Sequence, residues 1–496
     1  MSGAKIPPRV LAEQNSRTAL TLSDPTSRGR KLPQYTAAIL ATLGALSAGT
    51  FMSWSSPAIP LLQDKLNHFV VTEAQGSWIG ALMNLGAFLG AIPAGFAADR
   101  FGRKRTLFSM GFPLVAAWML IAFSDTVGEI YAGRLLGGMG VGAVSVVAPM
   151  YIGELAEPHI RGALGAFFQL QITLGILLGY LAGMASTVKA LSLICCAVPV
   201  VYLVLFVWMP ESPVFLVATN RRDEATRALQ WLRGPKYDLE DELTRMQDTM
   251  EESQRIQEPV LTLLRSKGVK RALVISLGLM TFQQLSGINA VIFYSGKIYA
   301  NVGGRLPPNT AAIIIGLVQV FATAASTQLV DRAGRRVLLL ASGGVMALCQ
   351  GLLGLYFYMK EAEFDLVYFR WLPLVCLALF IIMFSIGFGP IPWIMLSELF
   401  PPEAKAAAAA ISASCSWLLA FLVTLGFRRM GTTLGIDGAF WTFAIVCVFS
   451  VLFVAIKVPE TKNKDLEDIQ AELCGRRRQG EQEVMNRAMS SFPKPI

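Results

Sequence analysis

Twelve long apolar runs alternate with shorter polar segments along this chain. Hydrophobic residues make up 54% of it and charged residues only 16%, whereas an ordinary soluble protein carries roughly 25% charged residues. Each run approaches the roughly 20 apolar residues that a helix needs to cross the hydrocarbon layer of a bilayer. We therefore expect an all-α membrane protein with twelve transmembrane helices. The runs lie at approximately 36–56, 76–98, 106–123, 129–152, 163–184, 188–208, 271–296, 310–330, 336–358, 370–396, 405–427 and 437–457.

Charged motifs that follow the second, fourth and sixth runs recur, in the same order, after the eighth, tenth and twelfth. The recurring motifs are Asp99-Arg100-Phe101-Gly102-Arg103 with Asp331-Arg332-Ala333-Gly334-Arg335, Glu154 and Arg161 with Glu398 and Lys405, and Pro210-Glu211 with Pro459-Glu460. Basic loops that merely stop translocation would explain the charges, but not the shared glycine or the shared order. The repeat therefore predicts two six-helix halves. The expected segments are an N-terminal tail at 1–35, a first half at 36–209, a linker with short helices at 210–270, a second half at 271–457 and a C-terminal tail at 458–496.

The net charge of +9 is concentrated beside the ends of the apolar runs. The alternate loops near 57–75 and 124–129 are near neutral or acidic. Because basic loops stay on the cytosolic side of a membrane, we expect both termini and the linker in the cytosol, with Arg428 and Arg429 as an exception. Anionic lipid at the cytosolic face, and not nucleic acid, is the expected partner of the basic clusters.

The chemistry-bearing residues argue against several functions. Two histidines and seven cysteines give neither a metal-ligand spacing nor a disulfide framework, so we expect no metal and no cofactor. His68 and His159 fall in expected loops, so no nucleophile–base pair lies within the membrane and we do not expect an enzyme. An open channel would have no use for the repeated charged motifs.

Several apolar runs contain amides that are costly to bury unless they have a partner or a function. The seventh run carries Gln283, Gln284 and Asn289, and the tenth contains Gly387-Phe388-Gly389-Pro390-Ile391-Pro392-Trp393, which cannot be a regular helix. Broken helices at membrane depth are tolerated where they line a cavity. Amides supply donors and acceptors, and tryptophan supplies a flat apolar face, so the set suits a neutral polyhydroxylated ligand. Interhelical packing is the alternative role for each single glutamine.

Two parallel halves with a binding site between them are the architecture of a rocking carrier. Asp/Glu–Arg sets at the cytosolic ends of the helices would bias such a carrier between its two states. The stretch from Ala37 to Pro60 contains no Asp or Glu. Since a proton-coupled carrier needs a titratable group in its path, we expect a passive uniporter, with proton-coupled symport as the alternative.

In its motifs the chain resembles the sugar porters of the major facilitator superfamily, over roughly 36–470. Within that superfamily it is similar to the insect facilitated trehalose transporters and to the intracellular-class animal glucose facilitators. The motifs that carry this likeness are the two Asp-Arg-X-Gly-Arg segments, Gly133-Arg134, Pro210-Glu211-Ser212-Pro213, Gln283-Gln284-Leu285-Ser286-Gly287-Ile288-Asn289, Gly389-Pro390-Ile391-Pro392-Trp393 and Pro459-Glu460-Thr461-Lys462. Those that carry the likeness to the insect proteins are Ser56-Pro57, Gly76-Ser77-Trp78-Ile79-Gly80 and Ala228-Leu229-Gln230-Trp231-Leu232-Arg233-Gly234.

The resemblance implies roles for individual residues. It implies that Tyr294 helps to close an extracellular gate. The residues implied to bind or line the sugar cavity are Gln169, Gln283, Gln284, Asn289, Gln319, Trp393 and Trp417. Those implied to form a cytosolic lock are Asp99, Arg100, Arg103, Arg134, Glu154, Arg161, Glu211, Asp331, Arg332, Arg335, Glu398, Lys405 and Glu460.

The substrate is the least determined expectation. Gln319 and Ala420 stand where the glucose facilitators usually have asparagine, which speaks against simple glucose specificity. The resemblance to the insect proteins makes trehalose our first expectation and a hexose the alternative, with a non-transporting sugar receptor as a further one. We expect a monomer in the plasma membrane, or in an intracellular vesicle membrane as the alternative.

Overall fold

The computed structural model describes residues 29–64, 69–157, 159–235, 237–255, 262, 266–293, 307–462, 464 and 466–474. Within these ranges the regular secondary structure is helical, and twelve helices or helix pairs are long and apolar enough to cross a membrane. The expected all-α membrane fold with twelve spans is confirmed, and the protein is a multi-pass membrane protein.

The first six spans form the first half of the molecule and the last six form the second half. The first half consists of α2 (Lys31–Ser53) with α3 (Ser55–Leu62), α4 (Glu73–Phe101), α5 (Arg103–Ala122), α6 (Val127–Leu155), α7 (Arg161–Ala182) and α8 (Val188–Phe206). The second half consists of α13 (Lys267–Leu285), α15 (Pro308–Ala333), α16 (Arg335–Glu361), α17 (Leu372–Ile386) with α18 (Ile391–Glu398), α19 (Pro402–Thr433) and α20 (Gly435–Lys457).

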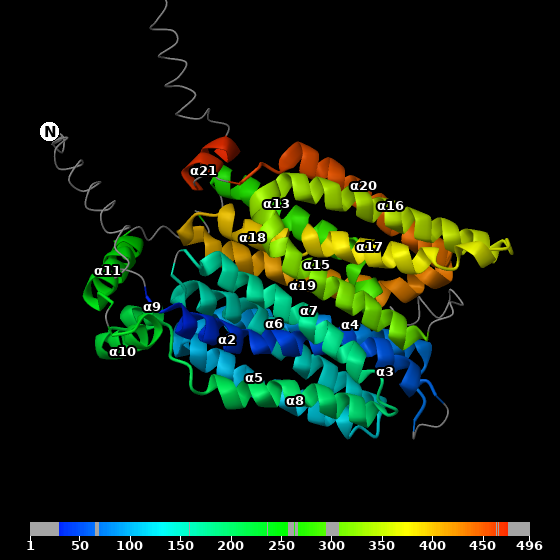
Figure 1. The fold of residues 1–496 in the computed structure, drawn as a ribbon, viewed down its shortest axis with the longest axis horizontal. Coiled ribbons are helices and arrows are strands. Elements are labelled where there is room, and N and C mark those ends of the chain that lie inside the picture. Colours follow the sequence, from blue (N-terminus) through cyan, green and yellow to red (C-terminus); the bar gives the residue numbers. More distant parts are fainter. Residues whose placement is uncertain are drawn as a thin grey trace, which may run out of the picture.

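Short helices gather at one end of the two halves (Figure 1). They are α9 (Pro213–Ala218), α10 (Arg222–Arg233) and α11 (Leu239–Arg255), which follow the first half, and α21 (Leu466–Cys474), which follows the second. The helix α21 falls in the segment that the sequence analysis treated only as a tail. Helices of the two halves meet along two seams, since α4 packs on α19 and α7 packs on α15.

Local sequence signals fix where individual helices begin and end. Thr72 and Gln75 form a reciprocal capping box at the start of α4, and Thr126 and Glu129 form another at the start of α6. At the other end of α4 the chain turns directly into α5 through Gly102, whose φ of +102° suits glycine. These signals set the depth of α4 and α6, and therefore the height at which their functional side chains lie.

Glycines let α4 and α6 approach closely. A Cβ built on Gly142 of α6 would lie 2.0 Å from the carbonyl oxygen of Ala87 in α4. Membrane helices associate largely through such close packing of small residues, because lipid supplies no hydrophobic drive between them. The close contact therefore holds the helix that carries Glu154 against the helix that carries Asp99.

This contact predicts opposite effects for one substitution at two positions of α6. Gly142→Ala forces α4 and α6 apart and should cost about 1–3 kcal/mol of stability, as overpacking does. Gly153→Ala is the matched control, because a Cβ there has no neighbour within 4 Å, and alanine is favoured over glycine in a helix by up to about 1 kcal/mol. Thermal unfolding of the purified protein in detergent measures both. Equal midpoints for the two variants would contradict the packing role of Gly142.

Candidate functional site

Three amides form a directed chain of hydrogen bonds at mid-depth of the second half. Asn289 donates from Nδ2 to Oε1 of Gln284 (2.5 Å), and Gln284 donates from Nε2 to Oε1 of Gln283 (3.3 Å) and to Oγ of Ser416 in α19 (2.7 Å). Gln283 and Asn289 are each only 3% exposed. The chain is possible because α13 ends at Leu285 and a turn at Gly287, with φ +86°, brings Asn289 back beside Gln284.

The amide chain ends on a broken helix. Gln283 donates from Nε2 to the carbonyl oxygens of Phe388 (2.6 Å) and Gly389 (2.9 Å), which lie between α17 and α18. The break falls in the segment where the sequence analysis expected an irregular helix, and that expectation is confirmed. Carbonyls freed by a helix break need a donor when water is absent. Gln283 supplies it, so one side chain joins the break to the amide chain.

The donor and acceptor inventory shows which amide has capacity left. Both Nε2 hydrogens of Gln283 and both of Gln284 are engaged by the contacts above, and each of the two carbonyl oxygens already accepts one hydrogen bond. Asn289 uses a single N–H among the described contacts, which leaves one donor and its Oδ1 acceptor. Asn289 therefore offers the most hydrogen-bonding capacity to a ligand.

The other residues expected to line the cavity lie on four helices. Trp393 is half-buried in α18, and half-buried Trp417 of α19 donates from Nε1 to Oγ of Ser145 in α6 (3.3 Å), across the two halves. Gln319 is buried in α15 and Gln169 is half-buried in α7. No described residue forms a hydrogen bond with the amide of Gln169 or Gln319. Tyr294, expected at a gate, lies outside the described residues.

A first ion-pair set lies at the end of the first half where α4 meets α5. We define it as Asp99, Arg103, Glu154 and Glu211. Arg103 bonds Asp99 Oδ1 from Nη2 (3.0 Å) and Glu154 Oε1 from Nε (2.9 Å), and it donates from Nη1 to the carbonyl of Ala98 (3.2 Å). The hydroxyl of Ser212 donates to the second oxygen of Glu154. Each nitrogen of this guanidinium therefore bonds a group of its own half.

A second ion-pair set repeats this geometry in the second half. We define it as Arg335, Glu398 and Glu460. Arg335 bonds Glu398 Oε1 from Nη2 (2.9 Å) and Nε (3.2 Å), and donates from Nη1 to the carbonyl of Val330 (3.2 Å). The hydroxyl of Thr461 donates to Glu398 Oε2 (2.5 Å), as that of Ser212 does to Glu154. The side chain of Asp331 lies outside what the structure describes.

Each set contains a carboxylate that caps the start of a helix. Glu211 accepts from the backbone N–H of Lys104 (2.7 Å) in α5, and Glu460 accepts from those of Arg335 (2.9 Å) and Arg336 (3.0 Å) in α16. Partial desolvation alone would raise the pKa of Glu460. The hydrogen bonds from these N–H groups and from that of Lys462 outweigh it and hold the pKa of Glu460 below its usual range. The carboxylate of Glu460 therefore stays charged where the positive end of the helix dipole lies.

Arg161 and Lys405 stand apart from both sets. Arg161 is exposed at the start of α7 and donates to the carbonyl of Ala156 (3.4 Å). Desolvation and the positive charge of Arg161 lower the pKa of Lys405 at the start of α19. Within the described ranges neither cation forms an ion pair, so two like charges face each other across the halves at this end.

The placement of Arg134 corrects its expected grouping with the lock residues. Arg134 is completely buried near the start of α6, about 30 Å along the helix from Glu154, given a rise of 1.5 Å per residue. It donates to the carbonyls of Ile79 (2.9 Å) and Phe51 (2.6 Å), and its guanidinium lies 5.4 Å from the ring centre of Trp54. Phe51 lies near the end of α2 and Ile79 lies in α4, so Arg134 joins both of these helices to α6.

The two remaining expected lock residues are exposed. Arg100 lies 5.7 Å from the ring centre of Phe101, and the carbonyl of Arg332 accepts from Nζ of Lys462 (2.6 Å). Neither contact joins the two halves.

Hydrogen bonds between the halves lie at mid-depth and at the end opposite the ion-pair sets. Besides the bond from Trp417 to Ser145 given above, they join Asn84 to Thr424 (3.1 Å), Tyr180 to the carbonyl of Ile292 (2.9 Å) and Asn309 to the carbonyl of Gly183 (3.0 Å). The ion pairs of each set, by contrast, join residues of one half. The structure is therefore closed at the end away from the sets.

Comparison with known proteins agrees with this arrangement. Residues 34–473 match the family described as "Sugar (and other) transporter". The chain belongs to this family. The facilitated trehalose transporter Tret1 of Culex quinquefasciatus is 39% identical to this transporter over 446 residues, which are 89% of the chain and 86% of the relative. Tret1 of Bombyx mori is 39% identical over 440 residues, with the same coverage of both chains. The chain spans about half the length of several other relatives, such as Tret1 of Anopheles gambiae at 56%.

Solved structures of the xylose transporter XylE from E. coli share the fold of this transporter. The inward-open conformation aligns with a TM-score of 0.73 and 25% identity, over 88% of this chain and 99% of that one. The partially occluded inward-open conformation aligns with the same TM-score and identity, over 87% of this chain. The expected major facilitator fold is thus confirmed.

Proposed function

We propose that this transporter carries a neutral sugar passively across its membrane by alternating access, with trehalose as the first substrate to test. The observation that carries the proposal is the amide chain of Gln283, Gln284 and Asn289 beside a broken helix. It presents neutral donors and acceptors at mid-depth, which match sugar hydroxyls and offer no charge to an ion. Relatives named facilitated trehalose transporters support the choice of sugar.

We assign different roles to the three amides and their neighbours. Asn289 and the free acceptor capacity of Gln284 bind sugar hydroxyls, while Gln283 holds the broken helix in place and offers one lone pair. Trp393 and Trp417 supply apolar faces for the sugar rings, and the amides of Gln169 and Gln319 bind from the facing helices. A disaccharide needs this larger set because its second ring adds hydroxyls at a distance from Asn289. Tyr294 keeps its proposed role as a gate.

The ion-pair sets serve the change between the two states. Both lie at the end that we assign to the cytosol, with both termini and the linker helices, so the structure corresponds to an inward-facing state. Closing this end would bring unpaired Arg161 and Lys405 toward carboxylates of the opposite half, such as Glu398 and Glu154.

We further propose that the transporter lies in the plasma membrane as a monomer, with anionic lipid at its cytosolic face and without catalytic activity. We also keep the division of the chain into the five segments given above.

Uptake in proteoliposomes tests the substrate and the coupling together. Trehalose uptake should saturate, follow its gradient and stay constant when external pH is varied, because the first span lacks a carboxylate between Ala37 and Pro60. Glucose uptake without trehalose uptake would show a hexose facilitator. Collapse of uptake with the proton gradient would show symport. No uptake of either sugar by correctly inserted protein would contradict the transport proposal.

Substitution of the central amide tests the sugar site. Gln284→Ala removes the link between Asn289 and Gln283, and the loss of one hydrogen bond to the sugar, worth about 0.5–1.5 kcal/mol, should raise KM roughly two- to tenfold. Half-buried Gln284 can be removed without unfolding the protein, which thermal unfolding checks. Gln230→Ala on the exposed face of α10 is the matched control and should leave uptake kinetics unchanged. Wild-type kinetics in Gln284→Ala would remove the amide chain from the sugar site.

Substitution of an unpaired cation tests the lock. Arg161→Ala removes no ion pair in the present state, only the long hydrogen bond to Ala156, but it removes an ion pair that forms when this end closes. It should therefore shift the population toward the present state, roughly two- to fivefold for a pair worth up to about 1 kcal/mol. Spin labels at Gly165 of α7 and Leu329 of α15, on opposite halves, report the separation of this end by their distance distribution.

The control for that measurement is Arg227→Ala, an exposed arginine of α10. It removes the same charge without a partner across the halves and should leave the distance distribution unchanged. An unchanged distribution in Arg161→Ala, or an equal shift in both variants, would contradict the lock role.

A further inference from the structure

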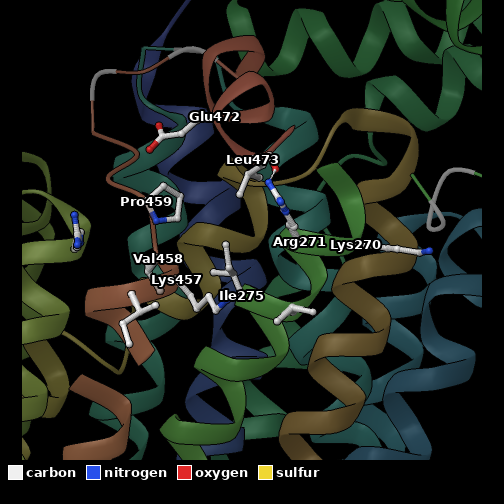
Figure 2. A pocket seen from close by; sticks show the side chains of 11 residues that line it. Lys270, Arg271, Ile275, Lys457, Val458, Pro459, Glu472 and Leu473 are labelled. Atoms are coloured by element: carbon white, nitrogen blue, oxygen red, sulfur yellow. Dashed lines mark hydrogen bonds between the residues drawn. The ribbon is translucent and has the colours of Figure 1, made fainter. Parts of the chain in front are cut away.

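A basic pocket of about 550 Å³ opens beside the second half, at the ion-pair end and away from the amide chain. It lies between the start of α13, the end of α20 and the docked helix α21 (Figure 2). Its polar lining consists of Lys270, Arg271, Arg336, Lys457 and Glu472. In Figure 2, Arg271 reaches toward Leu473 of α21, whereas the amine of Lys270 extends away from the other labelled side chains.

The balance of charge in this pocket favours an anion. Four cationic side chains line it against one carboxylate, and that carboxylate, Glu472, pairs with Nζ of Lys464 outside the lining (2.6 Å). The negative charge of the lining is therefore neutralised by a neighbour, and the cations dominate the field in the pocket. A phosphate group, with several acceptor oxygens, matches such a cluster.

The cations have donors to spare. Arg271 donates from Nη1 to the carbonyl of Leu473 (2.5 Å), which uses one of its five N–H groups. Arg336 donates from Nη2 to the carbonyl of Ala455 (2.6 Å), but its buried Nε has no partner. Lys457 is exposed at the last residue of α20, and no described residue pairs with its amine. An incoming phosphate would accept from the remaining N–H groups of Arg271 and from the exposed amine of Lys457.

The surroundings of the pocket favour a lipid over a soluble anion. Val274 of α13 and Ile456 of α20 line it and are 57% and 74% exposed. On the part of α20 that precedes Ile456, exposed Ile445, Val448, Phe449 and Leu452 form an apolar stripe. A basic pocket that opens onto an apolar stripe can hold a headgroup while the acyl chains run along the stripe. Basic pockets between membrane helices at the cytosolic side are typical sites for phosphorylated headgroups.

We propose that this pocket binds the phosphate-bearing headgroup of an anionic membrane lipid. The site is in a position to affect transport, because Arg336 joins it to the second ion-pair set through the backbone bond to Glu460 and Arg271 joins it to α21. The same helix α21 donates from Gln470 to the carbonyl of Leu399, directly after Glu398. The lipid therefore contacts the elements that surround the second ion-pair set. Only the assignment of the leaflet rests on the proposed function.

Lipid binding to the full-length protein, measured without sugar, tests the proposal. The probes are nanodiscs of phosphatidylcholine alone, or with phosphatidylserine or a phosphorylated phosphatidylinositol, and native mass spectrometry reads the bound lipid. The phosphorylated lipid should bind selectively. Lys457→Glu should weaken it roughly tenfold, because each basic group near an anionic headgroup contributes about a fivefold change in affinity and the reversal adds repulsion. Lys457→Gln serves if the reversal impairs folding, with about a fivefold loss expected.

Matched variants separate the pocket from general surface charge. Arg227→Glu reverses an exposed charge on α10 and should leave lipid binding unchanged; an equal loss in this variant would overturn the proposal. Ile456→Gln should weaken lipid binding without affecting binding of a soluble inositol phosphate. Equal binding of the soluble inositol phosphate and the lipid would show a site for a free anion and overturn the lipid assignment. The two proposals fail separately. A wild-type protein that takes up sugar but does not bind the phosphorylated lipid would overturn the lipid site, and one that binds the lipid but takes up no sugar would overturn the proposed function.

Discussion

A membrane protein must pair every backbone polar group that it buries, and this requirement organises the second half of the transporter. The break between α17 and α18 frees the carbonyls of Phe388 and Gly389, and the side chain of Gln283 pairs with both. Without that side chain the break would cost several kcal/mol in an environment free of water. The amide that stabilises the break also starts the chain to Gln284 and Asn289, so the architecture and the candidate sugar site depend on the same residue.

The two ion-pair sets show how far a repeated sequence becomes a repeated structure. Arg103 and Arg335 each donate from Nη1 to a carbonyl five residues earlier at 3.2 Å, and each bonds one glutamate whose second oxygen accepts from a hydroxyl. A glycine with positive φ precedes each arginine, at Gly102 and Gly334. The glycine permits the tight turn that aims the arginine back along its own half. The repeat is therefore an arrangement within each half, while Arg161 and Lys405, which form no ion pair within the described ranges, are the cations to which we assign a role between the halves.

The sequence predicted the parts of this structure that periodicity and local chemistry determine. Twelve spans, two halves and the irregular segment around Gly387–Trp393 follow from hydropathy, repetition and proline chemistry. It could not predict which carbonyls need a partner, because that depends on helices meeting in space. Arg134 was accordingly grouped with distant arginines, although it pairs with carbonyls of Phe51 and Ile79. The sequence did not predict α21 or the pocket that it lines for the same reason, because Arg271 and Leu473 are far apart along the chain.

The distribution of polar contacts explains how such a molecule can move without losing its site. The amide chain, the broken helix and each ion-pair set lie within a single half, so a rigid-body movement of the halves leaves them intact. The polar contacts that the structure describes between the halves at mid-depth are neutral hydrogen bonds, Asn84 to Thr424 and Trp417 to Ser145, each worth about 1 kcal/mol. Bonds of that strength can be exchanged for bonds to a sugar at little net cost. With the proposed site, the second half therefore carries most of the sugar-binding amides as a preformed unit, and movement of the first half would complete or open the cavity around it.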